Sequence, residues 1–233
     1  VANPANALMT LIAGMKDENG RITLPGFYDK VRPLDDEERV ELARLPMKDD
    51  FYLEATGSSE LWGEKSYSAV ERTGARPTLD VNGMLAGFTG EGAKTVLPAK
   101  AMAKISMRLV PDQTPDEVYE QLKQYMEENA PKGVTWDIKV EHGGHPSISE
   151  RDGVGVRAMA KAFENVWGVV PLFTRGGGSI PVVAEMQNIL GIESVLTGFG
   201  LPDDRIHSPN EKQDLPTWYR GIDALIHFFY NLG

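Results

Sequence analysis

The sequence contains no cysteine, and this absence excludes a class of bonds and a class of metal site. Without thiols the chain forms neither disulfides nor thiolate metal centres. Any metal ion bound by the chain would be held by histidine and carboxylate side chains, which suit zinc or manganese. The lack of cysteine also fits a reducing compartment, so we expect a cytoplasmic protein.

Long apolar runs and an excess of basic residues are also missing. No stretch approaches the roughly 18 consecutive apolar residues of a membrane span. The start, Val1 to Pro4, has neither the basic segment nor the apolar run of a signal peptide, and its lack of Met suggests a partial chain. With 24 Lys and Arg against 34 Asp and Glu, the net charge is −10. That charge repels nucleic acid and anionic membranes, so we expect neither as a partner.

Short motifs that build a site by themselves are absent as well. The sequence has only four histidines, and none lies in an HxxxH, HExxH or HxD pattern. A phosphate loop of the GxxxxGK[ST] type is not present either. By spacing alone, this chain does not build a complete metal site.

The hydrophobic pattern divides the 233 residues into two parts, with a boundary between residues 144 and 145. In the first part, capping signals and periodicity predict a helix from Asn3-Pro4, a helix from Asp35 to about Pro46 with Glu38 completing a capping box, strands within 77–110, a helix from Thr114-Pro115 and a strand over 134–140. Helices on one face of an antiparallel sheet form an α+β sandwich.

Residues 145–233 follow a different pattern. We expect a helix over 152–167, a strand over 169–174, a helix over 179–190, a strand over 192–199, a loop over 200–214 and a helix over 216–231. Helices that alternate with strands in this way are typical of the closing portion of an α/β sheet.

A glycine run lies between the strand predicted over 169–174 and the next helix, in Thr174-Arg175-Gly176-Gly177-Gly178-Ser179-Ile180-Pro181. Glycines let a ligand approach the backbone, and a helix N-terminus favours an anion. The same pattern also suits a tight turn with a serine cap, so the run alone leaves an anion site and a structural turn equally open. A carboxylate is as good a candidate ligand as a phosphate.

Two other segments carry candidate residues. His207 lies in the polar loop after a buried strand, where Asp203, Asp204 or Glu211 would bind metal beside it or orient its ring. A lone histidine is more commonly a surface residue. Arg108 lies on the polar face of a strand, where it would either grip a carboxylate or simply face solvent. His142 and His145 flank a Gly-Gly pair at the boundary, as a hinge contact or merely a linker.

Taken together, these segments resemble the M20 metallopeptidases, and most closely their carnosinase-like dipeptidases. The matching stretches are GAKTVLP (92–98), SMRLVPDQTPDEV (106–118), HGGHP (142–146), TRGGGSIP (174–181) and IHSPNEK (206–212). Their order and spacing agree over most of the chain, which makes the set far more specific than any one motif.

The resemblance implies a fold and a reaction. Residues 1–144 would be most of an α+β lid or dimerisation domain, which is inserted in an α/β zinc-peptidase catalytic domain. Residues 145–233 would be the C-terminal part of that catalytic domain. The implied reaction is hydrolysis of dipeptides or related amides by a metal-bridging hydroxide, in a homodimer formed through the lid. Two divalent metal ions, zinc or else manganese, are implied.

Residue roles follow from the same resemblance. His207 matches the final metal-ligating histidine, while Arg108 and His142 match lid residues that bind the substrate carboxylate or the reacting carbonyl region. Thr95 matches a residue that reaches the partner subunit's active site. The groups that hold the substrate match Gly177, Gly178 and Ser179. The general base and the other metal ligands match nothing in this chain, and would lie upstream of Val1.

The sequence departs from carnosinase-like relatives at Gly176, where they carry glutamate, so recognition of the substrate's amino end is in question. Two alternatives therefore stand beside the dipeptidase. One is an N-acyl amino acid deacylase or carbamoylase of the same family. The other is that the chain alone is a non-catalytic dimerisation fragment.

Overall fold

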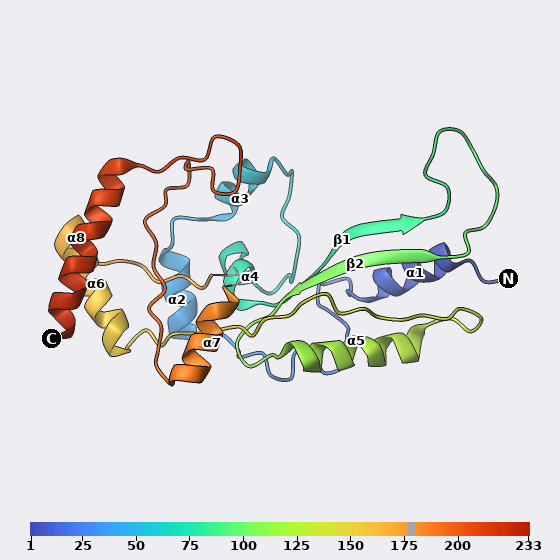
Figure 1. Cartoon of the computed structure of the whole chain (residues 1–233), viewed down its shortest axis with the longest axis horizontal. Helices are drawn as coiled ribbons and strands as arrows, with labels where there is room; N and C mark the ends of the chain where they lie inside the picture. The colour runs from blue at the N-terminus through green and yellow to red at the C-terminus, as the bar shows by residue number, and fades with distance from the viewer. Residues whose placement is uncertain (177–179) are drawn as a thin grey trace. The chain divides into compact units, whose positions relative to one another are not determined.

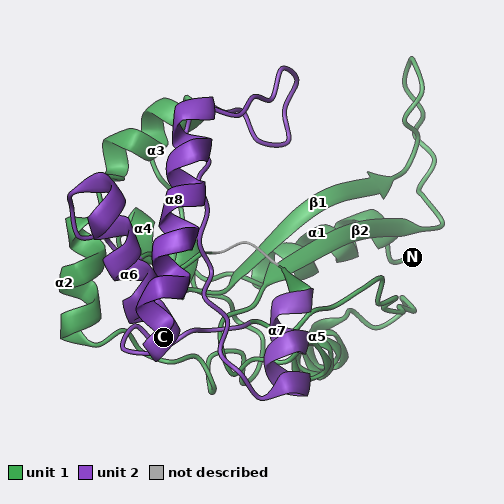
Figure 2. Ribbon diagram, turned by 60° about the vertical axis from the view of Figure 1, so that its left-hand side comes forward, with its two compact units in different colours: residues 1–146, 174–181 green, residues 147–173, 182–233 purple. Residues whose placement is uncertain are grey.

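A computed structural model describes residues 1–176 and 180–233. The chain forms two compact units, which are coloured separately in Figure 2. Unit 1 consists of residues 1–146 and 174–181, and unit 2 consists of residues 147–173 and 182–233. The described residues next to the glycine run, 174–176 and 180–181, thus belong to unit 1. The chain before residue 174, back to residue 147, and the chain after residue 181 belong to unit 2.

Unit 1 is an α+β arrangement around one antiparallel strand pair (Figure 1). Its elements are α1 (Pro4–Gly14), α2 (Asp36–Arg44), α3 (Asp49–Thr56), α4 (Ala69–Ala75), β1 (Thr78–Ala86), β2 (Ala101–Arg108) and α5 (Pro115–Asn129). The strand register runs from Thr78 opposite Arg108 to Ala86 opposite Ala101, with an irregularity between Val81 and Gly83. Exposure alternates along β2, as the sequence predicts for a half-buried strand.

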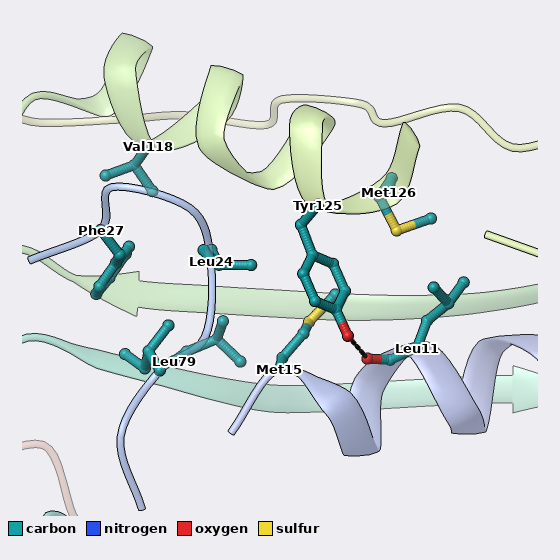
Figure 3. Close-up of a cluster of buried hydrophobic side chains, with 9 residues drawn as sticks. Leu11, Met15, Leu24, Phe27, Leu79, Val118, Tyr125 and Met126 are labelled. Atoms are coloured by element: carbon teal, nitrogen blue, oxygen red, sulfur yellow. Dashed lines mark hydrogen bonds between the residues drawn. The ribbon is translucent and has the colours of Figure 1, made fainter. Parts of the chain in front are cut away.

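The core of unit 1 lies between the strands and helices α1 and α5 (Figure 3). Its buried members are Leu11, Met15, Ile22, Leu24, Phe27, Leu79, Val118, Tyr125 and Met126. Tyr125 brings the one phenolic hydroxyl into this group and donates it to the carbonyl of Leu11 at 2.9 Å. That bond ties α5 to α1, because a buried hydroxyl needs a partner.

The predicted helix caps of unit 1 are confirmed in part. The Asn3 side chain accepts from the Ala5 amide at 2.9 Å, and that of Thr114 accepts from the Glu117 amide. Asp35 accepts from the Glu38 amide at 2.7 Å. The Glu38 carboxylate, however, does not return to Asp35 to complete the predicted capping box. It pairs with Arg175 instead, because a bidentate guanidinium is a stronger partner than one amide.

Unit 2 contains α6 (Val154–Trp167), α8 (Leu215–Leu232) and all but the first residue of α7 (Pro181–Leu190). Helix α6 ends at Gly168, which has a φ of 74°, as the predicted glycine stop requires. Helices α6 and α8 pack together, and Asn231 donates to the Ala158 carbonyl at 3.0 Å. None of the helices in the described parts of the chain is long and apolar enough to cross a membrane.

Three predicted strands are wrong. Residues 134–140 keep the period-two exposure, and Trp136 and Ile138 pack against the core of unit 1, but this segment is not paired as a strand. Residues 169–174 and 192–199 are not strands either, and Val169, Val170, Ile192 and Leu196 are more than half exposed. Apolar alternation indicates which side chains become buried. A strand also requires a neighbouring strand whose backbone is close enough to form hydrogen bonds with it.

Candidate functional site

The loop that carries His207 is closed by a buried carboxylate. Asp204 is 1 % exposed, and its side chain accepts from the Leu201 amide at 2.7 Å and from the Lys212 ammonium at 3.2 Å. The Lys212 amide donates to the Asp204 carbonyl at 3.0 Å, which joins the two ends of the loop. A charged group buried to this degree is stable only when it is paired in this way.

The backbone of the same loop is strained. Arg205, His207 and Asn210 have φ values of 55°, 62° and 62°. These values lie in the left-handed region, which residues other than glycine adopt only uncommonly. Such conformations persist only where the surrounding structure imposes them, and they concentrate at functional sites. The loop is therefore a candidate site, and the role of His207 in it stays a prediction.

Electrostatics limits what this loop offers a metal ion. Lys212 lies 2.9 Å from Asp203, and that hydrogen bond, together with the one to Asp204, raises the pKa of Lys212. The same contact lowers the pKa of Asp203. Both carboxylates are thus engaged by Lys212, and a part for Asp203, Asp204 or Glu211 in binding metal or orienting the His207 ring stays a prediction. Within the described residues, no three metal-ligating side chains gather into a site.

Thr95 and Arg108 lie at opposite ends of the strand pair in unit 1. Thr95 lies in the exposed loop between β1 and β2, which extends beyond the strands in Figure 1. Arg108 is the last residue of β2, with its side chain on the exposed face. Seven residue steps of a strand span roughly 23 Å. The two side chains of one chain therefore cannot contact the same dipeptide.

His142 lies in a segment that contacts the starts of two helices, and its side chain is exposed. A Cβ on the neighbouring Gly143 would come within 2.8 Å of the Pro115 ring, at the start of α5. A Cβ on Gly144 would lie 3.0 Å from the Pro181 ring, which is the first residue of α7. The two glycines thus permit a close approach that brings His142 near the chain that leaves the glycine run.

Three predicted substrate-binding residues, Gly177, Gly178 and Ser179, lie outside the described residues. Just before them, Arg175 forms an ion pair with Glu38, a contact that sequence reasoning missed because the two residues lie 137 positions apart. Two hollows of about 360 and 350 Å³ lie along α6 and α8 in unit 2. They are lined by none of the predicted site residues.

Comparison with known proteins decides the family. A sequence profile for the M20 peptidase dimerisation domain matches residues 1–134, which include every helix and strand from α1 to α5. The chain belongs to the M20 peptidase family. This match and the structural similarities below confirm the predicted fold class, an α+β dimerisation domain followed by the C-terminal portion of an M20 catalytic domain.

M20 relatives match along almost the whole chain. This chain is 32% identical to the Cys-Gly metallodipeptidase DUG1 of Candida albicans, in a match that covers 98% of this chain and 48% of that protein. An M20 family metallo-carboxypeptidase from Sulfolobus solfataricus matches with 31% identity and a TM-score of 0.86, over 100% of this chain and 53% of the other. Human carnosine dipeptidase 1 matches with 27% identity and a TM-score of 0.77, over 100% and 50%. The chain thus spans about half the length of these relatives.

Proposed function

We propose that this chain is the C-terminal portion of a metal-dependent dipeptidase, and that it supplies one metal ligand, His207, to a site completed by residues outside it. The observation that carries the proposal is the match of nearly the whole chain to metallodipeptidases. The loop of His207 supports it, because His207 keeps a left-handed backbone conformation in a loop that the buried, paired Asp204 closes.

The native cofactor in this proposal is a pair of divalent ions, with zinc favoured and manganese as the other option. Neutral imidazole suits zinc, and the absence of cysteine leaves only nitrogen and oxygen ligands. Bound zinc lowers the pKa of a coordinated water toward neutrality, which supplies the hydroxide that amide hydrolysis needs. The described residues alone do not form such a site, so the remaining ligands belong to the rest of the protein.

In the same proposal, the substrate is held by side chains of unit 1 and by the glycine run. Arg108 and His142 would bind the peptide's carboxylate and the reacting carbonyl region, and Gly177, Gly178 and Ser179 would also hold the substrate. Thr95 would serve the partner subunit of a homodimer. The roughly 23 Å between the two ends of β2 supports this last role, because Thr95 is out of reach of its own chain's Arg108.

We further propose a cytoplasmic enzyme that acts on peptides, with neither nucleic acid nor a membrane as partner. The net charge of −10 and the lack of cysteine support this environment.

The direct test is dipeptide hydrolysis by the full-length protein, before and after removal of metal with a chelator. We expect turnover that is lost on chelation and returns when zinc or manganese is added back. Hydrolysis that persists unchanged after the metal content has fallen to background would rule out the proposal.

A second candidate, an N-acyl amino acid deacylase or carbamoylase, is favoured by Gly176. The resemblance to carnosinase-like dipeptidases implies a glutamate at this position, whereas Gly176 has no side chain and the space around it is open. Rates on N-acyl amino acids and on free dipeptides, measured side by side with the full-length protein, separate the two activities.

A further inference from the structure

The residue that precedes the glycine run, Arg175, is bound through its side chain to helix α2. Its guanidinium donates two hydrogen bonds to the Glu38 carboxylate, of which the Nη2–Oε2 bond measures 2.8 Å. The two side chains are only 19% and 15% exposed, and both residues belong to unit 1. A bidentate pair with little solvent around it fixes orientation as well as distance.

The main chain of Arg175 is held independently by helix α4. A Cβ added to Gly74 would lie 2.1 Å from the Arg175 carbonyl oxygen and 2.7 Å from its carbonyl carbon. Only glycine allows the backbones of α4 and residue 175 to approach this closely. Arg175 is therefore held at two points, its guanidinium by Glu38 and its carbonyl against Gly74.

The helices that hold Arg175 are themselves braced. The Glu38 amide is capped by Asp35 at 2.7 Å, which fixes the first turn of α2. Arg39, the next residue along, donates to Glu71 of α4 at 2.9 Å. Helices α2 and α4 are thus joined to each other, and each of them also contacts Arg175: α2 through the ion pair and α4 through Gly74.

A segment that is held in place before its substrate arrives loses less conformational entropy on binding, which favours affinity. Two described residues beside the glycine run are held in this way: Arg175 before it, and Pro181 after it, whose ring lies close to Gly144. We propose that Glu38 and Gly74 make Arg175 a positioning residue that restrains the start of the glycine run before substrate arrives. Arg175 binds no anionic substrate in this scheme, because Glu38 already neutralises its charge. The inference rests on the proposed role of the run in holding substrate.

Two variants disrupt the restraint by different means. Glu38→Gln removes the charge partner of Arg175, and Gly74→Ala places a methyl group where the Arg175 carbonyl lies. In the full-length protein we expect both to raise KM for a dipeptide about tenfold, with kcat changed by less than about threefold and metal content unchanged. Arg44→Gln is the matched control, because it removes an ion pair with Glu41 within α2 and, among the described bonds, contacts neither α4 nor Arg175. The charge swap Glu38→Arg with Arg175→Glu should recover most of the lost KM.

Hydrogen exchange of the peptide that spans residues 174–181 supplies a readout that needs no activity. We expect Glu38→Gln and Gly74→Ala to accelerate exchange there about tenfold relative to wild type, and Arg44→Gln to leave it unchanged. Unchanged exchange in the first two variants, or equal acceleration in the control, would overturn the proposal. A wild-type protein without metal-dependent hydrolysis would refute the dipeptidase assignment, while the exchange data would still decide whether Arg175 is a positioning residue.

Discussion

Tyr125 shows how one polar atom is accommodated in an apolar core. Its ring is 6% exposed among the buried residues of unit 1, and its hydroxyl has the Leu11 carbonyl as partner (Figure 3). Burial raises the pKa of this phenol above its ordinary value near 10. The buried environment disfavours the phenolate, so the neutral form belongs to the folded state.

Tyr125→Phe should lower the free energy of unfolding by about 1 kcal/mol at neutral pH, because it removes the hydrogen bond between α5 and α1 while keeping the ring. The native pKa is raised, so the contribution of Tyr125 is complete below about pH 10 and is lost as pH rises further. Denaturant unfolding between about pH 8 and about pH 11 should therefore show a shallower alkaline loss in the variant than in wild type. An equal loss in both proteins would contradict the assignment, and the exposed Tyr230→Phe serves as control.

At the scale of single residues, the sequence indicated which residues to consider, but it did not indicate which other side chains they contact. His207, Arg108 and His142 were identified by the family resemblance, and their roles remain predictions. Glu38 was correctly predicted in the first turn of α2, yet its carboxylate contacts Arg175. No local pattern encodes a contact across 137 positions, because it depends on how distant segments pack.

At the scale of elements, the helices were predictable because their ends are marked locally. Asn3, Asp35 and Thr114 cap helices as expected, and Gly168 ends α6. The strands over 134–140, 169–174 and 192–199 were not predictable in the same way. A strand is stabilised by its neighbours, and the period-two pattern in Trp136 and Ile138 is satisfied by packing against a core without a ladder.

The loop over 200–214 provides a test at this scale, because two adjacent acids play different parts in it. Asp204 is buried and binds the Leu201 amide, while Asp203 is exposed and contacts only the shared Lys212 among the bonds described. Asp204→Ala in the full-length protein should weaken zinc affinity at least about tenfold, since the loop that orients His207 loses its internal support. Asp203→Ala should change it little. Titration against a chelating dye measures both, and equal effects would show that Asp204 has no special part in placing the histidine.

At the scale of the whole molecule, our proposal assigns this chain parts of a site rather than a complete site. Thr95 and Arg108 are separated by the length of β2, and His207 lies in unit 2 without two further ligands among the described residues. That this chain alone builds no complete metal site stays a prediction from its histidine spacing. Both the separation of Thr95 from Arg108 and the profile match to a dimerisation domain support assembly as a dimer.

The measurement that tests the account most directly is the metal content of purified full-length protein by elemental analysis. We predict that His207→Ala lowers bound metal by about one ion per chain. The variant His227→Ala, on α8 of the same unit, should keep the wild-type content. The isolated 233 residues should bind no stoichiometric metal and hydrolyse no dipeptide. Unchanged metal in His207→Ala, or zinc-dependent turnover by the isolated chain, would contradict the claim that this chain supplies one ligand of a site completed elsewhere.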